Sequence, residues 1–388
     1  METRKNAFTF VVLLGLVSLF ADMTYEGARS VTGPFLALLG ASSITVGFVA
    51  GFGELVGYGL RLASGFISDR TRKYWAITIA GYAVNLLAVP ALALANHWEL
   101  AAALMIAERM GKALRNPPRD IMLSYATQKI GRGWGFGFHE AMDQIGAVLG
   151  PLLVALIQAL RGEYRVAFAF LLIPAMLALA ILLVARFLYS RPQDLETTSP
   201  SAIPVKGFSR AFWLYLVAIA LIAAGYVDFP LIAFHFQRAR TVSQELIPLL
   251  YAIAMGTDAF AALFFGRLFD RYGFAVIALA AAVSLFFAPL VFAGTPVAAI
   301  AGMILWGIGM GAQESIMRAV VAEMIPSHQR GAAYGVFNTG YGIAWFLGSA
   351  LMGWLYGVSL VLLIAFSMVA QAASIPLVIF VMKRRRSA

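Results

Sequence analysis

Long apolar runs recur along the whole chain, and this feature constrains the fold more than any other. Twelve runs stand between short charged or turn-rich breaks, and a helix needs about 20 apolar residues to cross a bilayer. The chain is 61% hydrophobic and 12% charged, whereas soluble domains are about 45–50% apolar and about 25% charged. The sequence therefore excludes a water-soluble fold and predicts a polytopic integral membrane protein. The predicted spans are residues 7–39, 42–67, 75–95, 98–127, 132–158, 165–189, 211–236, 242–268, 273–293, 295–324, 329–356 and 358–382.

The runs are predicted to be helices. A transmembrane barrel would show segments of about 10 residues in which apolar and polar side chains alternate, and the run from Ala169 to Ala185 has no such alternation. The 36 Gly and 15 Pro do not oppose helices, because both are frequent in membrane helices. We therefore expect an all-α polytopic membrane protein.

Composition also excludes several kinds of chemistry. With no Cys, the chain has no disulfide framework, no thiolate metal site and no Cys nucleophile. The net charge of +10 does not indicate nucleic acid, because basic residues beside spans usually set topology or meet anionic lipid. No phosphate-binding G-x-x-x-x-G-K-[ST] motif occurs, so direct ATP drive is not supported. We expect no cofactor, no bound metal and no nucleic-acid partner.

One polar interruption is much longer than the others. It runs from Ser190 to Arg210 and contains three prolines and a Ser/Thr cluster, as linkers do. The predicted domains are an N-terminal six-helix bundle at 1–189, a cytoplasmic linker at 190–210 and a C-terminal six-helix bundle at 211–388.

The distribution of Lys and Arg predicts the side on which the termini lie. An even number of spans puts both termini on one side of the membrane. Of 29 basic residues, 18 fall in the termini and even-numbered connections, and 4 fall in the odd-numbered connections. Because cytoplasmic segments carry the excess of Lys and Arg, we expect both termini in the cytoplasm, in a bacterial or archaeal inner membrane.

Two short patterns recur about 200 residues apart and indicate an internal duplication. The first pattern occurs after the second span as Gly65, Asp69 and Arg70. It occurs again after the eighth span, 201 residues later, as Gly266, Asp270 and Arg271. The second runs from Arg132-Gly133 to Leu149-Gly150, and again from Arg330-Gly331 to Leu347-Gly348, at an offset of 198. Duplicated six-helix bundles are typical of secondary transporters, whose halves rock about a site near the bilayer midplane.

The first pattern resembles the loop signature of the major facilitator superfamily, G-x-x-x-D-R-x-G-R-[RK], between its second and third spans. The pattern here continues with Arg72 and Lys73, but Thr71 precedes Arg72 directly and the intervening Gly is missing. The resemblance covers the whole chain through the twelve spans and the linker. It implies a transporter whose rim loops latch the two halves in the outward-facing state; the alternative is that these bases only hold the loop inside.

Two further patterns resemble signatures of the same superfamily. Arg109 to Ala113 resembles the fourth-span pattern R-x-x-Q-G, whose arginine is thought to assist proton transfer. In the fifth span, Gly137, Gly146 and Gly150-Pro151 are similar to the signature of exporters and antiporters, with its trailing Gly pair replaced by Val154-Ala155. This similarity favours export, and ordinary close packing of helices is the alternative.

Charged residues inside a span are functional candidates, because each costs about 2.5–3.5 kcal/mol on insertion scales. Asp22 and Glu26 lie four residues apart, hence on one helix face, and Arg29 follows three residues later. We predict that these two acids bind protons, since crowding and desolvation favour the neutral form of an acid. An alternative in which Arg29 keeps Glu26 ionised is equally open.

The fourth span carries a cationic stripe. Its members Glu108, Lys112, Arg115 and Arg119 fall within about 60° of one another, and Arg109 lies about 100° round the helix. Lys112 and Arg115 are candidates to bind an anionic group of the substrate or to neutralise acids on adjacent helices. Those acids are Glu54, Glu140 and Asp143. Pro117-Pro118 is expected to bend or break this helix.

Two further sets of charged residues lie in the second and fifth spans. Glu54 shares a helix face with Arg61 seven residues later. His139-Glu140-Ala-Met-Asp143 is spaced like H-E-x-x-H, but Asp143 stands where the second metal-binding His belongs, so a zinc protease is not expected. His139 and Asp143 could coordinate a passing metal or relay a proton.

The second half carries fewer polar residues within its spans. They are Asp228, His235, Asp258, Gln313, Glu314, Arg318 and Asn338, of which Glu314 and Arg318 are expected to pair. We therefore predict that the coupling residues lie in the first half and that the second half supplies an apolar wall. Its aromatic residues are Phe229, Tyr251, Trp306, Tyr341 and Trp345, for which packing or lipid contact is the alternative.

The sequence thus predicts a secondary active transporter that exports a small organic compound by proton-coupled alternating access. The candidates for proton coupling are Asp22, Glu26, Arg109, Glu54 and Asp143. The expected partners are a small-molecule substrate, protons and the lipid bilayer, and we expect a monomer that is not an enzyme. Import or uniport of an organic anion or a metal ion is the alternative. A remote one is an intramembrane hydrolase, for which the twofold repeat has no explanation.

Overall fold

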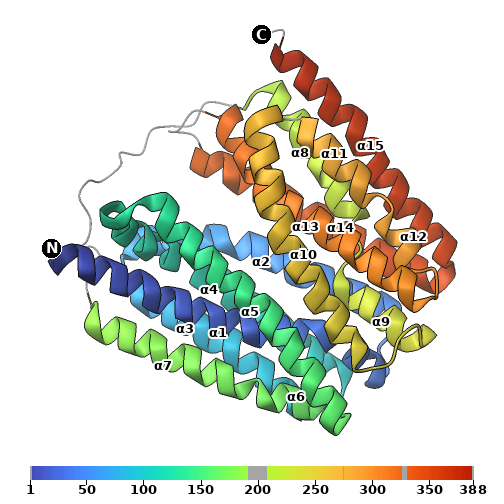
Figure 1. Ribbon diagram of the computed structural model, residues 1–388, viewed down its shortest axis with the longest axis horizontal. Helices are drawn as coiled ribbons and strands as arrows, with labels where there is room; N and C mark the ends of the chain where they lie inside the picture. Colours follow the sequence, from blue (N-terminus) through green and yellow to red (C-terminus); the bar gives the residue numbers. More distant parts are fainter. Residues whose placement is uncertain (1, 191–207, 274, 326–329, 387–388) are drawn as a thin grey trace. The chain divides into compact units, whose positions relative to one another are not determined.

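The computed structural model describes residues 2–190, 208–273, 275–325 and 330–386 (Figure 1). Within these residues the ordered elements are helices and none is a strand, which confirms the predicted all-α class. Residues 191–207 of the expected linker lie outside the described residues. The helices are α1 (Glu2–Leu38), α2 (Ser43–Thr71), α3 (Tyr74–Ala91), η1 (Leu92–Leu94), α4 (Trp98–Ile130), α5 (Arg132–Arg161), α6 (Tyr164–Phe170), α7 (Leu172–Leu188), α8 (Arg210–Gly225), α9 (Phe229–Ala239), α10 (Leu246–Tyr272), α11 (Ala275–Ser284), α12 (Phe287–Val291), α13 (Pro296–Met324), α14 (Arg330–Val358) and α15 (Leu360–Arg386).

These helices make up the twelve predicted spans, and three spans consist of two helices each. The sixth span is α6 with α7, the seventh is α8 with α9, and the ninth is α11 with α12. The second helix of each pair has a proline in its first turn, namely Pro174, Pro230 or Pro289. A proline lacks the N–H that would hydrogen-bond to the preceding turn, so each span is interrupted where its proline enters.

Ten spans are long and apolar enough to cross a membrane by length and composition among the described residues. Of the two other spans, α4 carries the cationic stripe, and Ala275–Val291 is shorter. Charged residues inside α4 lower its hydropathy, although its 33 residues exceed the about 20 that a span needs. The helix of lowest hydropathy is therefore the one that carries more of the ionisable candidates than any other helix.

The chain folds as two compact units. The first unit comprises residues 1–35 and 56–201, and the second comprises residues 36–55 and 202–388. This division differs from the domain boundaries expected from the sequence, because the first half of α2 groups with the C-terminal helices. Within the second unit, a Cβ at Gly47 would lie 2.8 Å from the Cα of Gly353 on α14, and the Phe48 and Phe346 rings are 5.4 Å apart.

The core of the first unit is built from apolar side chains of α1, α3, α4 and α7. Phe10, Trp75, Leu86, Met122 and Leu182 are among its buried members. Because lipid tails are as apolar as these side chains, close packing of helices is the main source of stability for this core.

Glycines allow the closest helix contacts, and these contacts recur in both units. A Cβ at Gly146 would meet the carbonyl oxygen of Leu19, and a Cβ at Gly150 would meet that of Met23, so α5 lies directly on the backbone of α1. In the same way, a Cβ at Gly348 of α14 would meet the carbonyl oxygen of Ala224 of α8. Gly150 and Gly348 are equivalent at the offset of 198, so the repeat includes the packing of these helices.

Of the two outcomes expected at Pro117-Pro118, a bend or a break, the structure shows no break. The helix continues from Trp98 to Ile130 through Pro117 and Pro118. Pro118 has no N–H to donate to the carbonyl oxygen of Leu114, and that oxygen accepts a hydrogen bond of 2.6 Å from the Ser64 hydroxyl of α2. A hydroxyl from a neighbouring helix thus replaces the lost backbone donor, as membrane helices permit.

The helix ends also recur, and they correct the interpretation of the loop signature. After α2 the N–H of Arg72 donates to the carbonyl oxygen of Ser68 at 2.8 Å, and after α10 the N–H of Gly273 donates to that of Phe269 at 2.7 Å. Both residues have positive φ, 53° for Arg72 and 61° for Gly273, at the offset of 201. Arg72, where the first loop lacks the glycine of the signature, therefore lies in the positive-φ region that favours glycine.

This pair of helix ends gives a first testable prediction. Gly273→Ala is expected to lower the free energy of unfolding by about 1–3 kcal/mol, because a Cβ strains this conformation. Arg72→Gly is expected to change it by less than about 1 kcal/mol, since relief of strain is offset by a more flexible unfolded chain. Thermal unfolding of the purified variants in detergent measures both, and a stable Gly273→Ala protein contradicts the argument.

Candidate functional site

Three side chains of α1 face three side chains of α4 in the interior of the first unit. On α1 they are spaced by four residues, and on α4 by three and four, so each set lies on one helix face. The residue numbers of the partners rise along α1 and fall along α4, so the contacts form an antiparallel ladder between the two helices. We call these residues the α1–α4 ladder: Ser18, Asp22 and Glu26 with Arg119, Arg115 and Lys112.

Two ion pairs form the middle and one end of the ladder. The Nη2 atom of Arg115 lies 3.8 Å from Oδ1 of Asp22, and Nζ of Lys112 lies 3.9 Å from Oε1 of Glu26. Asp22, Glu26 and Arg115 are all buried, and Arg115 is only 1% exposed. Both distances exceed the about 3.2 Å of a good hydrogen bond, so each pair is held by charge more than by direct hydrogen bonding. Such pairs can part when the acid takes up a proton.

Aromatic rings surround the two bases. The Lys112 Nζ lies 3.9 Å from the centre of the Tyr25 ring, and the Arg115 guanidinium lies 4.2 Å from the Tyr82 ring and 5.7 Å from the Tyr25 ring. The ring faces carry negative electrostatic potential and attract cations within about 6 Å. The rings therefore hold the bases in place without neutralising them.

The other end of the ladder continues into α5 through a histidine. Ser18 accepts a hydrogen bond of 3.2 Å from Nη1 of Arg119 and lies 2.9 Å from Nε2 of His139. The other ring nitrogen, Nδ1, lies 3.5 Å from Oδ2 of Asp143. Arg119 also donates two hydrogen bonds, of 2.8 and 2.9 Å, to Asp120. Imidazole between a hydroxyl and a carboxylate is an arrangement that can pass a proton.

Next to the ladder, Glu108 and Arg109 form a separate pair. The Arg109 Nε lies 3.4 Å from the Glu108 carboxylate, which also accepts a hydrogen bond of 2.7 Å from Asn85 of α3. The Asn85 side chain donates to the Glu108 carbonyl oxygen as well, at 3.1 Å. Glu108 is thus fixed to α3, and Arg109 faces an acid of its own helix.

The ladder corrects the expected partners of the stripe on α4. Lys112 and Arg115 pair with the acids of α1, whereas Asp143 pairs with His139, and Glu140 is exposed. Glu54 lies on the part of α2 that belongs to the second unit. The sequence could not show this, because helix spacing gives the face on which a residue lies but not the helix that it faces.

The remaining ionisable candidates of the first unit are two arginines outside the ladder. Arg61 stands over the ring of Tyr58, 5.0 Å from its centre, and is half-buried, as is Arg29. Glu54 and Arg61, which share a helix face, fall on opposite sides of the division between the units.

In the second unit the predicted aromatic wall is a packed cluster. Phe229 and Tyr251 have ring centres 4.2 Å apart, Tyr341 and Trp345 are 5.5 Å apart, and all of these rings are buried together with Trp306. These five residues therefore occupy packing positions, the alternative that the sequence left open.

Polar side chains of the second unit are fewer and more scattered. Trp345 donates a hydrogen bond of 3.1 Å to the buried Asp228, and Asp258 is buried on α10. Glu314 is exposed and Asn338 is half-buried, while the side chain of Arg318 lies outside the described ones. Among the described residues, no group of three or more His, Asp or Glu side chains gathers to hold a metal ion.

The rim loops and the glycines of α5 have distinct surroundings. The side chains of the first loop, Asp69, Arg70, Arg72 and Lys73, are exposed, and so are Asp270 and Arg271 of the second. Gly65 and Gly266 lie under these loops near α4 and α13, with Cβ positions 3.8 Å from Pro117 and 4.0 Å from Ser315. Gly137 is exposed with nothing near its Cβ position, whereas Gly146, Gly150 and Pro151 are buried.

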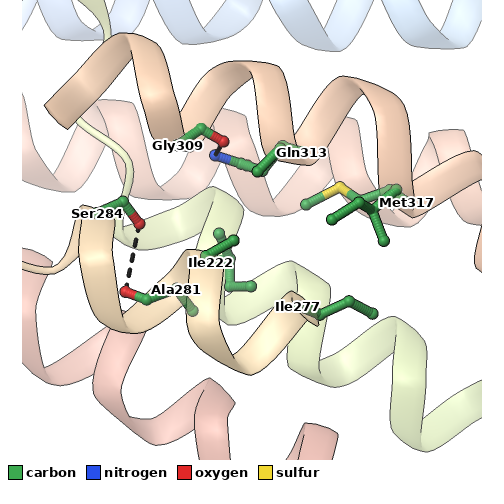
Figure 2. Close-up of a pocket in the computed structure, with 10 residues that line it drawn as sticks. Ile222, Ile277, Ala281, Ser284, Gly309, Gln313 and Met317 are labelled. Atoms are coloured by element: carbon green, nitrogen blue, oxygen red, sulfur yellow. Dashed lines mark hydrogen bonds between the residues drawn. The ribbon is translucent and has the colours of Figure 1, made fainter. Parts of the chain in front are cut away.

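A small cavity lies inside the second unit between α8, α11 and α13. Figure 2 shows Ile222, Ser284 and Gln313 on its walls, with the Ser284 hydroxyl bonded to the carbonyl oxygen of Ala281 at 3.3 Å. Its volume of about 20 Å³ suits one water molecule, whereas ligand sites measure about 300–1,000 Å³. This cavity is therefore too small to hold a substrate.

Sequence reasoning missed four residues of the site. Ser18, Tyr25, Tyr82 and Asn85 complete the partners of the charged side chains, but serine and tyrosine are common in membrane helices and give no signal of their own. An asparagine in the middle of an apolar span is a signal, because its amide needs a partner there. Asn85 could have been found in this way.

Comparison with known proteins identifies the family. The sequence profile described as Major Facilitator Superfamily matches residues 14–349 and 214–387. The chain belongs to this superfamily. The uncharacterized protein Rv2265 of Mycobacterium tuberculosis is 43% identical over 361 residues, which cover 92% of this chain and 88% of that protein. The uncharacterized MFS-type transporter MJ1317 of Methanocaldococcus jannaschii is 26% identical over 92% of this chain and 90% of its own.

A shorter match and two solved structures agree with this family. The multidrug resistance protein MdtH of Proteus mirabilis is 31% identical over 119 residues, 31% of this chain and 30% of its own. The nucleoside transporter NupG has a TM-score of 0.74 at 14% identity, with 96% of this chain and 98% of that chain covered. The peptide transporter POT in complex with sulfate has a TM-score of 0.75 at 13% identity, with 97% of this chain and 94% of that chain covered. Both show the same fold, and the chain is a multi-pass membrane transporter of two six-helix bundles.

Proposed function

We propose that this chain exports a small organic compound in a proton-coupled cycle of alternating access. The α1–α4 ladder is the observation that carries the proposal. Asp22 and Glu26 each face a base at 3.8–3.9 Å, beyond hydrogen-bonding distance, so either carboxylate can take up a proton without breaking a direct hydrogen bond to its base. Protonation of either acid removes its ion pair and changes the balance between conformations of the unit.

The relay from α5 supplies a path for the proton. His139 connects the Asp143 carboxylate to the Ser18 hydroxyl at the end of the ladder. A histidine can accept a proton at one ring nitrogen and donate one from the other, so it can pass a proton between such groups. Arg109 and Glu54 remain proposed contributors to coupling, on the strength of the superfamily pattern and of their place within spans.

Export is the direction that two observations favour. The glycines of α5 follow the signature of exporters, and two of them lie against the backbone of α1, next to the ladder. The part of the chain that matches MdtH is similar to a protein named for multidrug resistance. We propose on the same basis that the rim loops latch the transporter, and that a monomer works in an inner membrane with both termini in the cytoplasm.

An enzyme is the weaker proposal for the same residues. Ser18 is the hydroxyl that His139 could activate, as in a hydrolase triad. This hydroxyl is fully buried and already accepts a hydrogen bond from Arg119, so it offers no accessible nucleophile. A carrier needs only that the pairs break and re-form.

Proton movement in liposomes tests the proposed function. Liposomes that contain the purified protein and a trapped pH-sensitive dye are expected to show proton flux that depends on an added compound, drawn from a panel of organic acids, amines and neutral metabolites. Asp22→Asn is expected to reduce this flux to the level of protein-free liposomes, because the amide binds no proton. Glu99→Gln, which neutralises an exposed acid in the first turn of α4, serves as the matched control and keeps the flux. Compound flux that ignores an imposed pH gradient contradicts proton coupling.

A further inference from the structure

Arg115 is a buried guanidinium that leaves most of its hydrogen-bonding capacity unused. Its side chain is 1% exposed, and neither Nε nor Nη1 has a hydrogen-bond partner among the described residues. The Nη2 atom lies 3.8 Å from Asp22, beyond hydrogen-bonding distance. An arginine has five N–H donors in a planar fork, so this one holds donors in reserve.

The surroundings fix the guanidinium in position. The Tyr82 ring lies 4.2 Å from it, and the Tyr25 ring lies 5.7 Å away. Gly81 of α3 lets α4 approach at this point, because a Cβ there would lie 2.8 Å from the Cβ of Arg115. The donors are therefore held in place by packing and are not carried on a mobile side chain, as a binding site requires.

Unpaired donors on a buried charge are costly, and the fold retains them. A buried donor without an acceptor loses its hydration with no compensation, more so when it is charged. Asp22, the acid at 3.8 Å, uses one nitrogen of the fork. A carboxylate that took the place of Asp22 could accept two parallel N–H bonds, one from Nη2 and one from Nη1 or Nε, because its two oxygens match that geometry.

We propose that Arg115 binds the carboxylate of a small organic acid, and that this acid is the cargo. The proposal rests on the proposed function and deepens it. Asp22 and the cargo carboxylate are alternative partners for the same guanidinium. While Asp22 is ionised it holds Arg115, and once Asp22 has taken up a proton the cargo replaces it.

This exchange fixes the sign of the coupling. In the empty carrier the charges of Asp22 and Arg115 cancel. In the loaded carrier Asp22 is neutral, and the charge of Arg115 is cancelled by the cargo. Both forms carry the same net charge, and the loaded form holds one proton with one anion. Cargo and proton therefore move in the same direction, so in the proposed export cycle an acidic cargo leaves together with a proton, and the coupling is cotransport and not the exchange typical of antiporters.

The other charged groups around Asp22 have partners of their own. On α4, Lys112 pairs with Glu26 at 3.9 Å, and on α5, Asp143 pairs with His139 at 3.5 Å. Tyr25, on the same helix as Asp22, faces Lys112 with its ring and is also hydrogen-bonded to Asp22 through its side chain. Arg119 is bonded to Asp120 and Ser18. Asp22 is thus the acid whose protonation frees Arg115.

Equilibrium binding to the full-length protein in nanodiscs tests the proposal. The probes are benzoate, hexanoate and gluconate, each compared with its neutral amide, between about pH 6 and 8, where the carboxylates stay ionised. At least one acid is expected to bind while its amide does not. Its Kd is expected to rise with pH, by up to about tenfold per unit, because one proton binds with it. Asp22→Asn mimics the protonated acid and is expected to bind more tightly, with no dependence on pH.

Substitution of Arg115 decides whether this residue makes the contact. Arg115→Gln is expected to weaken binding of the same acid by about 30-fold or more, whereas Arg161→Gln, at the exposed end of α5, leaves it unchanged. If Arg115→Gln does not fold, the double variant with Asp22→Asn removes both charges and keeps the pair neutral. That double variant is expected to fold and to lose binding, in contrast to Asp22→Asn alone.

Four outcomes overturn the proposal. They are binding by none of the three acids, equal binding of the amides, unchanged binding in Arg115→Gln, and binding that tightens as the pH rises, which would mean that proton and cargo compete. Compound-dependent proton flux in liposomes without carboxylate binding overturns the organic-acid site and leaves the proposed function standing. Carboxylate binding without any such flux overturns the proposed function and leaves the organic-acid site standing.

Discussion

Gly150→Ala is expected to destabilise the first unit by about 1–3 kcal/mol, and Gly150→Val to leave no folded protein. The added Cβ would lie against the carbonyl oxygen of Met23 and 2.8 Å from the backbone nitrogen of Gly27. Backbone atoms cannot move aside as the end of a side chain can, so α1 and α5 must separate along their contact. Thermal unfolding and the yield of monodisperse protein in detergent measure the effect.

Two matched variants make this test specific. Gly137→Ala lies on the same helix, where nothing approaches its Cβ position within 4 Å, and is expected to be neutral or stabilising by up to about 1 kcal/mol. Gly348→Ala, at the equivalent contact of the second unit with Ala224, is expected to destabilise as Gly150→Ala does. Equal stability of the Gly137 and Gly150 variants would contradict the close contact between α1 and α5.

Lys112→Met is expected to destabilise the protein by about 3–5 kcal/mol, because it leaves the buried Glu26 carboxylate without the base that lies 3.9 Å away. Removing one member of a buried pair costs more than removing both. The double variant with Glu26→Gln is therefore expected to recover most of the lost stability. Thermal unfolding of the four proteins gives the interaction energy as a double-mutant cycle.

The control for this cycle is a base of the same type outside the membrane interior. Lys73→Met removes an exposed lysine at the rim and is expected to change stability by less than about 0.5 kcal/mol. If the double variant is no more stable than Lys112→Met, Lys112 and Glu26 do not stabilise the unit as a pair. Loss of proton flux in a stable double variant would separate the role of the pair in coupling from its role in folding.

Much of the fold could be predicted from local sequence patterns. The positions of the twelve spans follow from hydropathy, and the interruptions at Pro174, Pro230 and Pro289 follow from a single property of proline. Local patterns could not decide whether Pro117-Pro118 bends or breaks α4, because the compensating hydroxyl of Ser64 comes from a residue about 50 positions away. Nor could they show that Arg72, where the first loop lacks the glycine of the signature, adopts a positive φ.

The candidate site was predicted as a set of residues but not as a set of contacts. Asp22 and Glu26 were identified because charge is costly in a span, and helical spacing placed them on one face. That Asp22 meets Arg115, and Glu26 meets Lys112, depends on α1 lying beside α4 in one register. The sequence named Glu54, Glu140 and Asp143 as acids for Lys112 and Arg115 to neutralise, and it could not name the acids of α1 as their partners for the same reason.

The sequence by itself determined that this chain is a duplicated helical membrane protein. The bilayer imposes a length and a polarity on every segment separately, so those properties are visible one span at a time. The tertiary structure alone decided which acid holds which base, and that Nε and Nη1 of Arg115 have no hydrogen-bond partner among the described residues. Such contacts join residues about 100 positions apart, and only the packing of whole helices, through glycines that let backbones meet, brings them together.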